Sequence, residues 1–335
     1  MSKTTPQPPS PAEVQQVVWM KQVSSLEHIP VDSAPPQPVL SGIDLQMERG
    51  QSWGICGDSL YELKLLLEIV ANLRPYDKGQ CVLMERGMMR RKRRILHHVF
   101  YIGSAQMLYD NMNVLEYLMF ATDHLWQNSV EKQEQIFEYL IQIGLGHICL
   151  TTIRLLTKEE RAVVTLLAAA YSPCNLVVLN LPQYTFDEPL RTAVGQISLL
   201  LRASGHALLI STPDAELIER SCTHAAYLHK GRLLCSGSVL ALKAEHDRVA
   251  VVLQDRNLPS LQERLELCLP NCELRLQGNR LLVLPKETEP VTAQQIYEAV
   301  TGAGLAPDRM ERNPKTLKNA FEELVAQHDL SEQLL

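Results

Sequence analysis

The stretch that decides the fold is residues 54–65, which read Gly54-Ile-Cys-Gly57-Asp-Ser-Leu60-Tyr-Glu-Leu63-Lys64-Leu65. An apolar run typical of a buried strand leads into this stretch, and an apolar run typical of a helix follows it. A phosphate-binding loop of the form G-x-x-x-x-G-K-[ST] belongs at such a junction. Its glycines let backbone N–H groups surround phosphates, its lysine reaches the outer oxygens, and its hydroxyl holds Mg²⁺.

The side chains that such a loop needs are replaced in this sequence. Gly57 fits the first glycine, but Leu60 and Glu62 stand at the later glycine positions. Leu63 stands at the lysine position and Lys64 at the hydroxyl position. A charged hydrogen bond to phosphate contributes roughly 1.5–3 kcal/mol, and a carboxylate beside a polyphosphate repels it. We interpret the stretch as a vestigial nucleotide-binding loop, with candidate residues Gly54, Gly57, Asp58, Ser59, Leu60, Lys64 and Leu65.

Short segments on both sides of this loop follow one another in a recognisable order. They are residues 39–45, 49–50, 71–79, 99–103, 108–118, 156–161, 176–182, 184–187 and 211–214. In this order and at this spacing they resemble the motifs of the ATP-binding subunits of ABC transporters. Each segment is weak alone, so the resemblance rests on their collinearity over residues 39–240. It implies an α/β, P-loop NTPase-like nucleotide-binding domain with a helical subdomain.

The resemblance also implies catalytic positions, and this chain departs from the family pattern at each of them. The glutamine that contacts the metal and the attacking water falls on Ser104, and the metal-binding aspartate on Asn180. The general-base glutamate falls on Leu181, which cannot accept a proton, and the switch histidine on Pro213. Loss of a general base alone costs about 10²–10⁴-fold in rate. Because Leu63 replaces the lysine as well, we expect no catalytic residue and no ATP hydrolysis.

The resemblance places a signature-like segment at Thr157, Lys158, Glu159 and Glu160, and a D-loop-like residue at Asp187. Lys158 and Glu159 replace glycines that, in the family, clamp the γ-phosphate of a nucleotide held by the opposite subunit. Family subunits dimerise head to tail and dock on a membrane-spanning subunit. The implied partners are therefore a membrane-spanning transporter subunit and a second ATPase subunit, in a homodimer or a heterodimer. ATP remains possible as a ligand through the resemblance, but the positions for Mg²⁺ are altered.

Composition and the family resemblance together predict the organisation of the chain. We expect a disordered Pro/Ser-rich tail over residues 1–15, an ABC ATPase-like domain over 16–245 and a small α+β domain over 248–335. The helical subdomain should cover about residues 105–172. Residues 17–23 predict a first strand, and the proline-rich residues 29–38 predict a stiff connection.

Four continuous apolar runs, residues 52–56, 99–102, 176–179 and 207–210, predict a parallel sheet that is buried on both faces. Residues 225–237 predict a hairpin that turns at Lys230 and Gly231. From Arg248 onward the pattern predicts a β-α-β-β-α-β order, hence a small split-βαβ domain. The ending, residues 314–324, resembles the tail of ATPase subunits that serve ABC-2 type exporters. The resemblance then covers about residues 16–327.

The overall composition is that of an ordinary globular protein, with 335 residues, a net charge of −6, 46% hydrophobic and 21% charged residues. This charge gives no general attraction to nucleic acid or anionic lipid. No apolar run reaches the roughly 18 residues that span a bilayer, and no signal peptide is recognisable. We therefore expect a cytoplasmic protein, peripheral on the inner face of the membrane through its partners. The eight cysteines show no paired spacing, so we expect no metal site.

The sequence favours a catalytically degenerate subunit with a structural or regulatory role in an ABC-2 type export complex. Three alternatives stay open. The fold could be retained for packing alone, without any nucleotide. An unorthodox ATPase could use Lys64 from its shifted position and Glu62 or Asp187 as base. A nucleic-acid regulator could use the basic block at residues 90–94, although no aromatic residues interleave it and a solvated loop is favoured.

Overall fold

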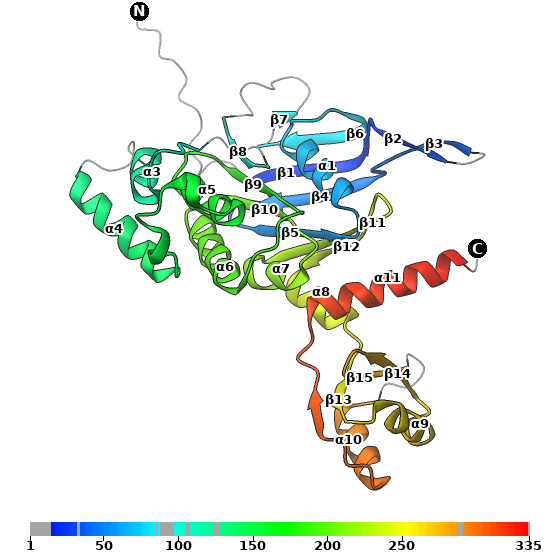
Figure 1. The fold of residues 1–335 in the computed structure, drawn as a ribbon. Helices are drawn as coiled ribbons and strands as arrows, with labels where there is room; N and C mark the ends of the chain where they lie inside the picture. Colours follow the sequence, from blue (N-terminus) through cyan, green and yellow to red (C-terminus); the bar gives the residue numbers. More distant parts are fainter. Residues whose placement is uncertain are drawn as a thin grey trace, which may run out of the picture. The chain divides into compact units, whose positions relative to one another are not determined.

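The computed structural model describes residues 15–31, 34–84, 86–87, 97–104, 108–122, 128–286 and 291–333. The chain forms two compact units, Met1–Val239 and Leu240–Leu335, and each has its own apolar core (Figure 1). Residues 1–14 of the expected tail and the whole basic block at 90–94 lie outside the described residues.

A six-stranded sheet forms the centre of the first unit in the described part of the chain (Figure 1). Its order is β12 (Arg232–Ser238), β11 (His224–His229), β5 (Ser52–Gly57), β10 (Ala207–Ser211), β9 (Leu176–Asn180) and β8 (Val99–Ile102). All neighbours pair in parallel except β12, which returns antiparallel beside β11. Every residue of β5, β9 and β10 is buried, because other elements cover both faces of this sheet. The predicted parallel sheet is confirmed.

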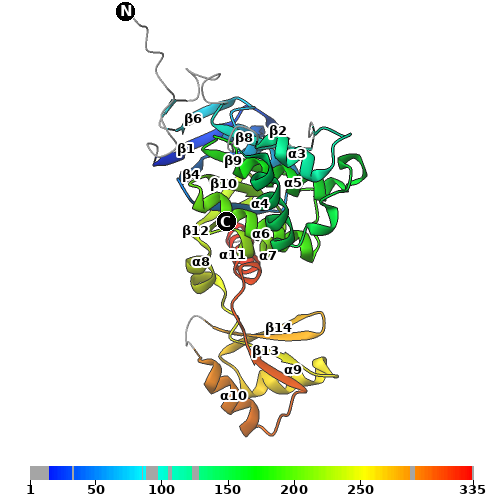
Figure 2. The ribbon, with the colours of Figure 1, turned by 90° about the vertical axis from the view of Figure 1, so that its left-hand side faces the viewer.

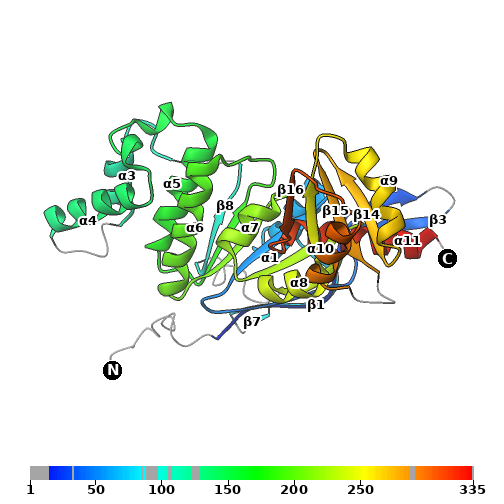
Figure 3. The ribbon, with the colours of Figure 1, turned by 90° about the horizontal axis from the view of Figure 1, so that it is seen from below.

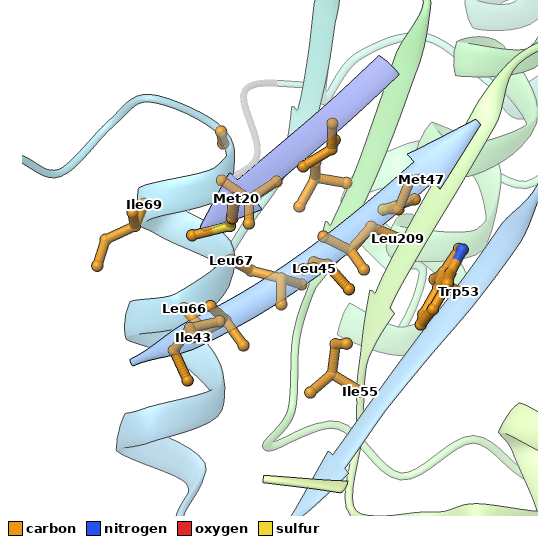
Figure 4. Packing of buried hydrophobic residues seen from close by; sticks show 14 of the residues in the cluster. Met20, Ile43, Leu45, Met47, Trp53, Ile55, Leu66, Leu67, Ile69 and Leu209 are labelled. Carbon is orange, nitrogen blue, oxygen red and sulfur yellow. The ribbon is translucent and has the colours of Figure 1, made fainter. Parts of the chain in front are cut away.

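A second, antiparallel sheet lies over helix α1 (Leu60–Val70). Its order is β4 (Ile43–Glu48), β1 (Gln16–Ser25), β6 (Tyr76–Leu83) and β7 (Arg86–Gly87). Along β4, buried and exposed residues alternate, as expected when one face of a strand meets the core. Figure 4 shows Leu66 and Leu67 of α1 beside Met20 and Leu45 of this sheet and Leu209 of the parallel sheet. The first core therefore lies between the two sheets and includes α1.

The proline-rich residues after β1 differ from the prediction. The expected stiff connection is wrong, because β2 (His28–Val31) and β3 (Ala34–Pro38) pair as an antiparallel ribbon. This ribbon forms a separate two-stranded sheet, so it has edges where a missing proline N–H breaks no ladder. The proline content predicted an extended backbone but missed the pairing.

Helices cover the other face of the parallel sheet. They are α5 (Lys158–Ala170), α6 (Glu188–Ala203) and α7 (Ala215–Ser221), which pack side by side. Figure 3 shows α3 (Val114–Ala121) and α4 (Ser129–Gln142) at one end of the unit, beside α5. Two 3₁₀ turns, η2 (Gly146–Ile148) and η3 (Ile153–Leu155), connect α4 to α5, so the expected helical subdomain is confirmed. None of the helices in the described ranges has the length and apolar character that crossing a bilayer requires.

The predicted hairpin is confirmed by β11 and β12. Its turn residues, Lys230 and Gly231, have φ of 48° and 75°, as a tight hairpin turn of this hand requires. A Cβ atom at Gly231 would collide with the carbonyl oxygen of Val39, so glycine is needed there for close approach as well.

The second unit has the predicted β-α-β-β-α-β order. Its elements are β13 (Val251–Gln254), α9 (Leu258–Cys268), β14 (Cys272–Gln277), β15 (Arg280–Pro285), α10 (Ala293–Gly302) and β16 (Arg309–Arg312). The strands form one antiparallel sheet in the order β14-β15-β13-β16, which confirms the small α+β domain. Helices α9 and α10 share its core and lie together in Figure 2. Helix α8 (Val239–His246) spans the boundary between the units, and α11 (Leu317–Gln333) ends the described chain.

Candidate functional site

The junction between β5 and α1 is shorter than a phosphate-binding loop. Only Asp58 and Ser59 separate Gly57, the last residue of β5, from the start of α1. Ser59 caps the helix, because its Oγ accepts a hydrogen bond from the N–H of Glu62 at 3.3 Å. Its carbonyl oxygen accepts the N–H of Leu63 at 3.1 Å. Two backbone donors that the motif would direct at phosphate are therefore engaged within the protein.

The two glycines of the stretch serve close packing within the unit. A Cβ atom at Gly54 would lie 2.5 Å from side-chain carbons of Ile218 on α7. A Cβ atom at Gly57 would collide with the backbone carbonyl of Leu228 on the neighbouring strand β11. Both positions have ordinary strand conformations, so the requirement for glycine comes from space and not from a positive φ.

Two carboxylates of the junction bind the neighbouring strand and turn. Oδ1 of Asp58 accepts from the hydroxyl of Tyr227 at 2.6 Å, and its Oδ2 lies 2.5 Å from Nδ1 of His229. Oε2 of Glu62 accepts from the backbone N–H of Gly231 at 2.9 Å, in the β11–β12 turn. Burial raises the pKa of Glu62, against the opposing effects of the Gly231 hydrogen bond and of His229. The edge of the sheet where a phosphate would bind thus carries carboxylates.

Sequence reasoning assigned no role to Tyr227 and His229. It interpreted β11 only as one arm of a hairpin, whereas β11 also runs parallel to β5, with Tyr227 opposite Cys56 and Leu228 opposite Gly57. The carboxyl ends of parallel strands meet at the same edge of a sheet. Placing β11 in the parallel sheet would have brought both side chains to the junction.

The residues at the lysine end of the motif are distributed around α1. Leu63 and Leu65 are buried in the core of the first unit. Lys64 is 47% exposed, and its Nζ lies 3.9 Å from a carboxylate oxygen of Glu68, one helical turn further on. Leu60, in the first turn, is exposed. The position that would supply a charge to phosphate is therefore part of the hydrophobic core.

Asn180 is the polar centre of the strand ends. Its Nδ2 donates to the backbone carbonyl of Lys64 and to the hydroxyl of Tyr101, both at 2.9 Å. Its Oδ1 accepts from the hydroxyl of Ser211 at 2.9 Å. The side chain is 2% exposed, and these bonds link α1 with the ends of β8, β9 and β10. The amide is satisfied inside the protein, as buried polar groups generally are.

The other catalytic positions carry no ionised group. Leu181 is buried directly after β9. Ser104 is exposed in the bend after β8. The carbonyl oxygen of Pro213 accepts from Sγ of Cys56 at 3.4 Å. Burial raises the pKa of Cys56 to about 12, so its thiol stays protonated at neutral pH.

The signature-like residues form the start of α5. Oγ1 of Thr157 accepts the N–H of Glu160 at 3.1 Å, and the Glu160 carboxylate accepts the N–H of Thr157 at 2.7 Å, which is a capping box. Nζ of Lys158 lies 5.0 Å from the ring centroid of Tyr184 and 3.7 Å from a carboxylate oxygen of Glu159. Two carboxylates in the first turn already offset the positive end of the helix dipole. An anion approaching this helix end would meet them.

The D-loop-like Asp187 is an N-cap. Its Oδ1 accepts the N–H of Leu190 at 3.1 Å and so begins α6. Asp214 caps α7 in the same way, and its carboxylate lies 2.8 Å from a guanidinium nitrogen of Arg191. These carboxylates hold helix ends in place.

Some of the predicted site residues gather in three groups, whereas Ser104, Pro213 and Asp187 lie outside them. The first is Asn180 with the backbone of Lys64, and the second is Asp58 and Glu62 with β11 and its turn. The third is the start of α5 with Tyr184, which lies between β9 and α6. No carboxylate takes part in the Asn180 group, so its donor set does not suit Mg²⁺, which prefers carboxylate ligands and water.

The chain is similar in sequence to several curated ABC transporter ATP-binding proteins. An uncharacterised one from Nostoc is 24% identical over 202 residues, covering 60% of each chain. The Nod factor export ATP-binding protein I of Azorhizobium caulinodans is 24% identical over 206 residues, covering 61% of this chain and 62% of its own. Its namesake from Cupriavidus metallidurans is 22% identical over 284 residues, covering 84% and 91%. The chain spans about three fifths of the length of the first relatives, and no protein-family model matches it.

Solved structures share the fold. The cbiO1 protein of Clostridium perfringens, part of the ABC transporter complex cbiONQ, matches with a TM-score of 0.54 and 14% identity over 76% of this chain and 96% of its own. An ATP-binding cassette solved as a dimer in a post-hydrolysis state, with ADP and Pi, matches with a TM-score of 0.51 and 14% identity. That match covers 66% of this chain and 98% of the cassette.

Replacement of Asn180 by Asp should destabilise the first unit. The carboxylate would face the Lys64 carbonyl, so two acceptors would oppose each other in a buried site. We expect a loss of about 2–4 kcal/mol in the free energy of unfolding, measured by urea denaturation. The exposed Asn111→Asp is the matched control and should change stability by less than about 0.5 kcal/mol. Equal effects of the two variants would contradict the proposed importance of the network.

Replacement of Glu62 by Gln should make stability less dependent on pH. The folded-state pKa of Glu62 is raised, so the folded protein binds its proton more tightly than the unfolded chain. This contribution favours folding at low pH and is lost as pH rises through the raised pKa. The stability of Glu62→Gln relative to the parent should therefore improve between pH 4 and pH 7, measured by urea denaturation at each pH. A difference that stays constant with pH would refute this linkage.

The two solved structures match this chain over 76% and 66% of its length, and the matched relatives are named as ATP-binding proteins. The chain therefore has the fold of an ABC nucleotide-binding domain and is similar in sequence, at 22–24% identity, to ATP-binding proteins of ABC transporters.

Proposed function

We propose that this chain is a non-hydrolysing subunit of an ABC export complex, with a structural or regulatory role. The observation that carries the proposal is the β5–α1 junction, where a capped helix takes the place of the phosphate-binding loop. ATP with Mg²⁺ does not fit the residues present there. The loop is short, two of its amide donors, those of Glu62 and Leu63, are engaged, and its two carboxylates would repel phosphate.

The positions for water activation support the same reading. Leu181 has no proton acceptor, and the amide of Asn180 is committed to three partners inside the protein. The candidate bases of an unorthodox ATPase are also engaged, since Glu62 binds the β11–β12 turn and Asp187 caps α6. Lys64, the candidate cation, pairs with Glu68 on the surface of α1. No specific observation favours the unorthodox ATPase.

The signature-like segment at the start of α5 also lacks features that a γ-phosphate contact needs. A segment that clamps a γ-phosphate needs free backbone donors and positive potential. Here Thr157 and Glu160 occupy each other's backbone groups, and Glu159 adds a further carboxylate. If this chain pairs with an intact second ATP-binding subunit, neither composite site keeps a complete set of phosphate contacts.

An export complex is favoured over an import complex because two Nod factor export relatives align over 84% of this chain, whereas a molybdenum import ATP-binding protein aligns over 77%. The Nod factor export protein of Cupriavidus metallidurans aligns over 84% of this chain, which reaches into the small C-terminal unit. In the proposed complex the chain lies at the cytoplasmic face of the membrane, bound to a membrane-spanning subunit and to a second ATP-binding subunit. The nucleic-acid alternative depends on residues 90–94, which lie outside the described residues, and no other observation favours it.

The purified chain should neither bind nor hydrolyse ATP. We expect no saturable heat in calorimetric titration up to millimolar ATP, with or without Mg²⁺, and turnover far below about 1 s⁻¹. The double variant Leu63→Lys with Lys64→Ser should also stay inactive, because Asn180 and Leu181 still lack carboxylates. Micromolar binding, or activity that returns with these two changes alone, would overturn the proposal.

The partner surface should lie on the helical subdomain. Ile141 on α4 is 55% exposed and Leu199 on α6 is 50% exposed, so they form a matched pair of surface apolar residues. We expect Ile141→Asp to abolish co-purification of a multispanning membrane protein from detergent-solubilised native membranes, because the change places a charge in an apolar contact. Leu199→Asp, as the control, should retain it. Retention of the membrane protein by both variants would contradict an interface at Ile141.

A further inference from the structure

A groove of about 680 Å³ opens on the first unit, at the far end of β5 from the junction. Trp53, near the start of β5, lines the groove, whereas the junction begins at Gly57, about 13 Å further along the strand. The other walls come from β1, β4, β11 and β12, and all lining residues belong to the first unit. The groove is therefore separate from the nucleotide position, and nothing in the proposed function uses it.

An ordered pair of rings forms one wall of the groove. The rings of Trp53 and His224 are stacked, with centroids 4.9 Å apart and planes 14° apart. Nε1 of Trp53 donates to Oε1 of Gln51 at 2.9 Å, and the same oxygen accepts the backbone N–H of Glu48 at 3.0 Å. Burial lowers the pKa of His224, so its ring is neutral at pH 7. Trp19, half-buried on β1, adds a second indole to the lining.

The charges of the groove are unequally distributed. Both oxygens of Asp44 accept hydrogen bonds from Gln22, each at 2.7 Å. Lys21 also lines the groove and carries a charge opposite to that of Asp44. Glu48 lies four residues along β4, beside the stacked rings, and its charge acts on His224. Within the described residues, the Glu48 carboxylate makes no hydrogen bond or ion pair.

We propose that this groove binds a small organic cation, an ammonium group that carries apolar or flat substituents. Aromatic ring faces attract cations, and Trp is the strongest of the side chains that do so. Glu48 supplies the counter-charge and the half-buried Trp19 supplies an indole ring. The stacked pair of His224 and the buried Trp53, which is 6% exposed, forms an apolar wall. An anion is disfavoured, because the two carboxylates outnumber Lys21 along the groove.

Benzyltrimethylammonium chloride is a suitable probe, read through tryptophan fluorescence. The chain has three tryptophans, so Trp126→Phe leaves only the two that line the groove. In this background we expect a saturable change in fluorescence. Glu48→Gln should weaken binding about tenfold or more, and Trp19→Leu should weaken it as well. Glu138→Gln, an exposed carboxylate on α4, is the matched control and should bind like the parent.

Charge reversal gives an independent check. Glu48→Lys should lose the cation and gain affinity for benzenesulfonate, while its thermal unfolding stays like that of the parent because Glu48 is exposed. The proposal fails if the parent shows no saturable binding of the cation probe. It fails equally if Glu48→Gln binds as well as the parent, or if the parent prefers benzenesulfonate.

Discussion

The burial of α1 between two sheets is the constraint on which the first unit depends. The buried side of the helix begins at Leu63 and continues through Leu66, Leu67 and Ile69. Each such side chain contributes about 1.5–3 kcal/mol when it leaves water. Because this apolar side already includes Leu63, the helix must begin at a residue that precedes Leu63 in the sequence. It begins at Leu60, and Ser59 caps its first turn directly after the strand. The burial of Leu63 within the helix therefore goes together with a junction of only two residues between β5 and α1.

A second consequence concerns the direction of hydrogen bonds at the strand ends. An ionised carboxylate only accepts hydrogen bonds, whereas an amide also donates two. At Asn180 both donors are used, toward the backbone of α1 and toward Tyr101 on β8. An aspartate at position 180 would lose the hydrogen bond from Nδ2 to the Lys64 carbonyl, which holds the helix against the sheet. Leu63 and Asn180 therefore both hold α1 against the strands. Leu63 does so by apolar burial, and Asn180 does so by hydrogen bonds.

Much of the architecture could be predicted from sequence because its signals are local and strong. Continuous apolar runs gave the parallel strands, and the Lys230–Gly231 pair gave the hairpin. The order of short motifs gave the family of folds. The pairing of β2 with β3 was missed, since prolines hide strand pairing. The contacts of Asp58 and Glu62 were also missed, because they depend on a neighbour about 170 residues away in the chain, and spacing along the sequence carries no such information.

The carboxylates of Asp58 and Glu62 give the sheet edge an anion of its own. The Tyr227 hydroxyl, the His229 ring and the Gly231 amide each have a carboxylate of the same chain as hydrogen-bond partner. Under the proposed function, the position of the β11–β12 turn would be set when the chain folds and would not vary with the supply of a diffusible nucleotide. In the proposed complex, such a unit would serve as a fixed frame beside a partner subunit that responds to ATP.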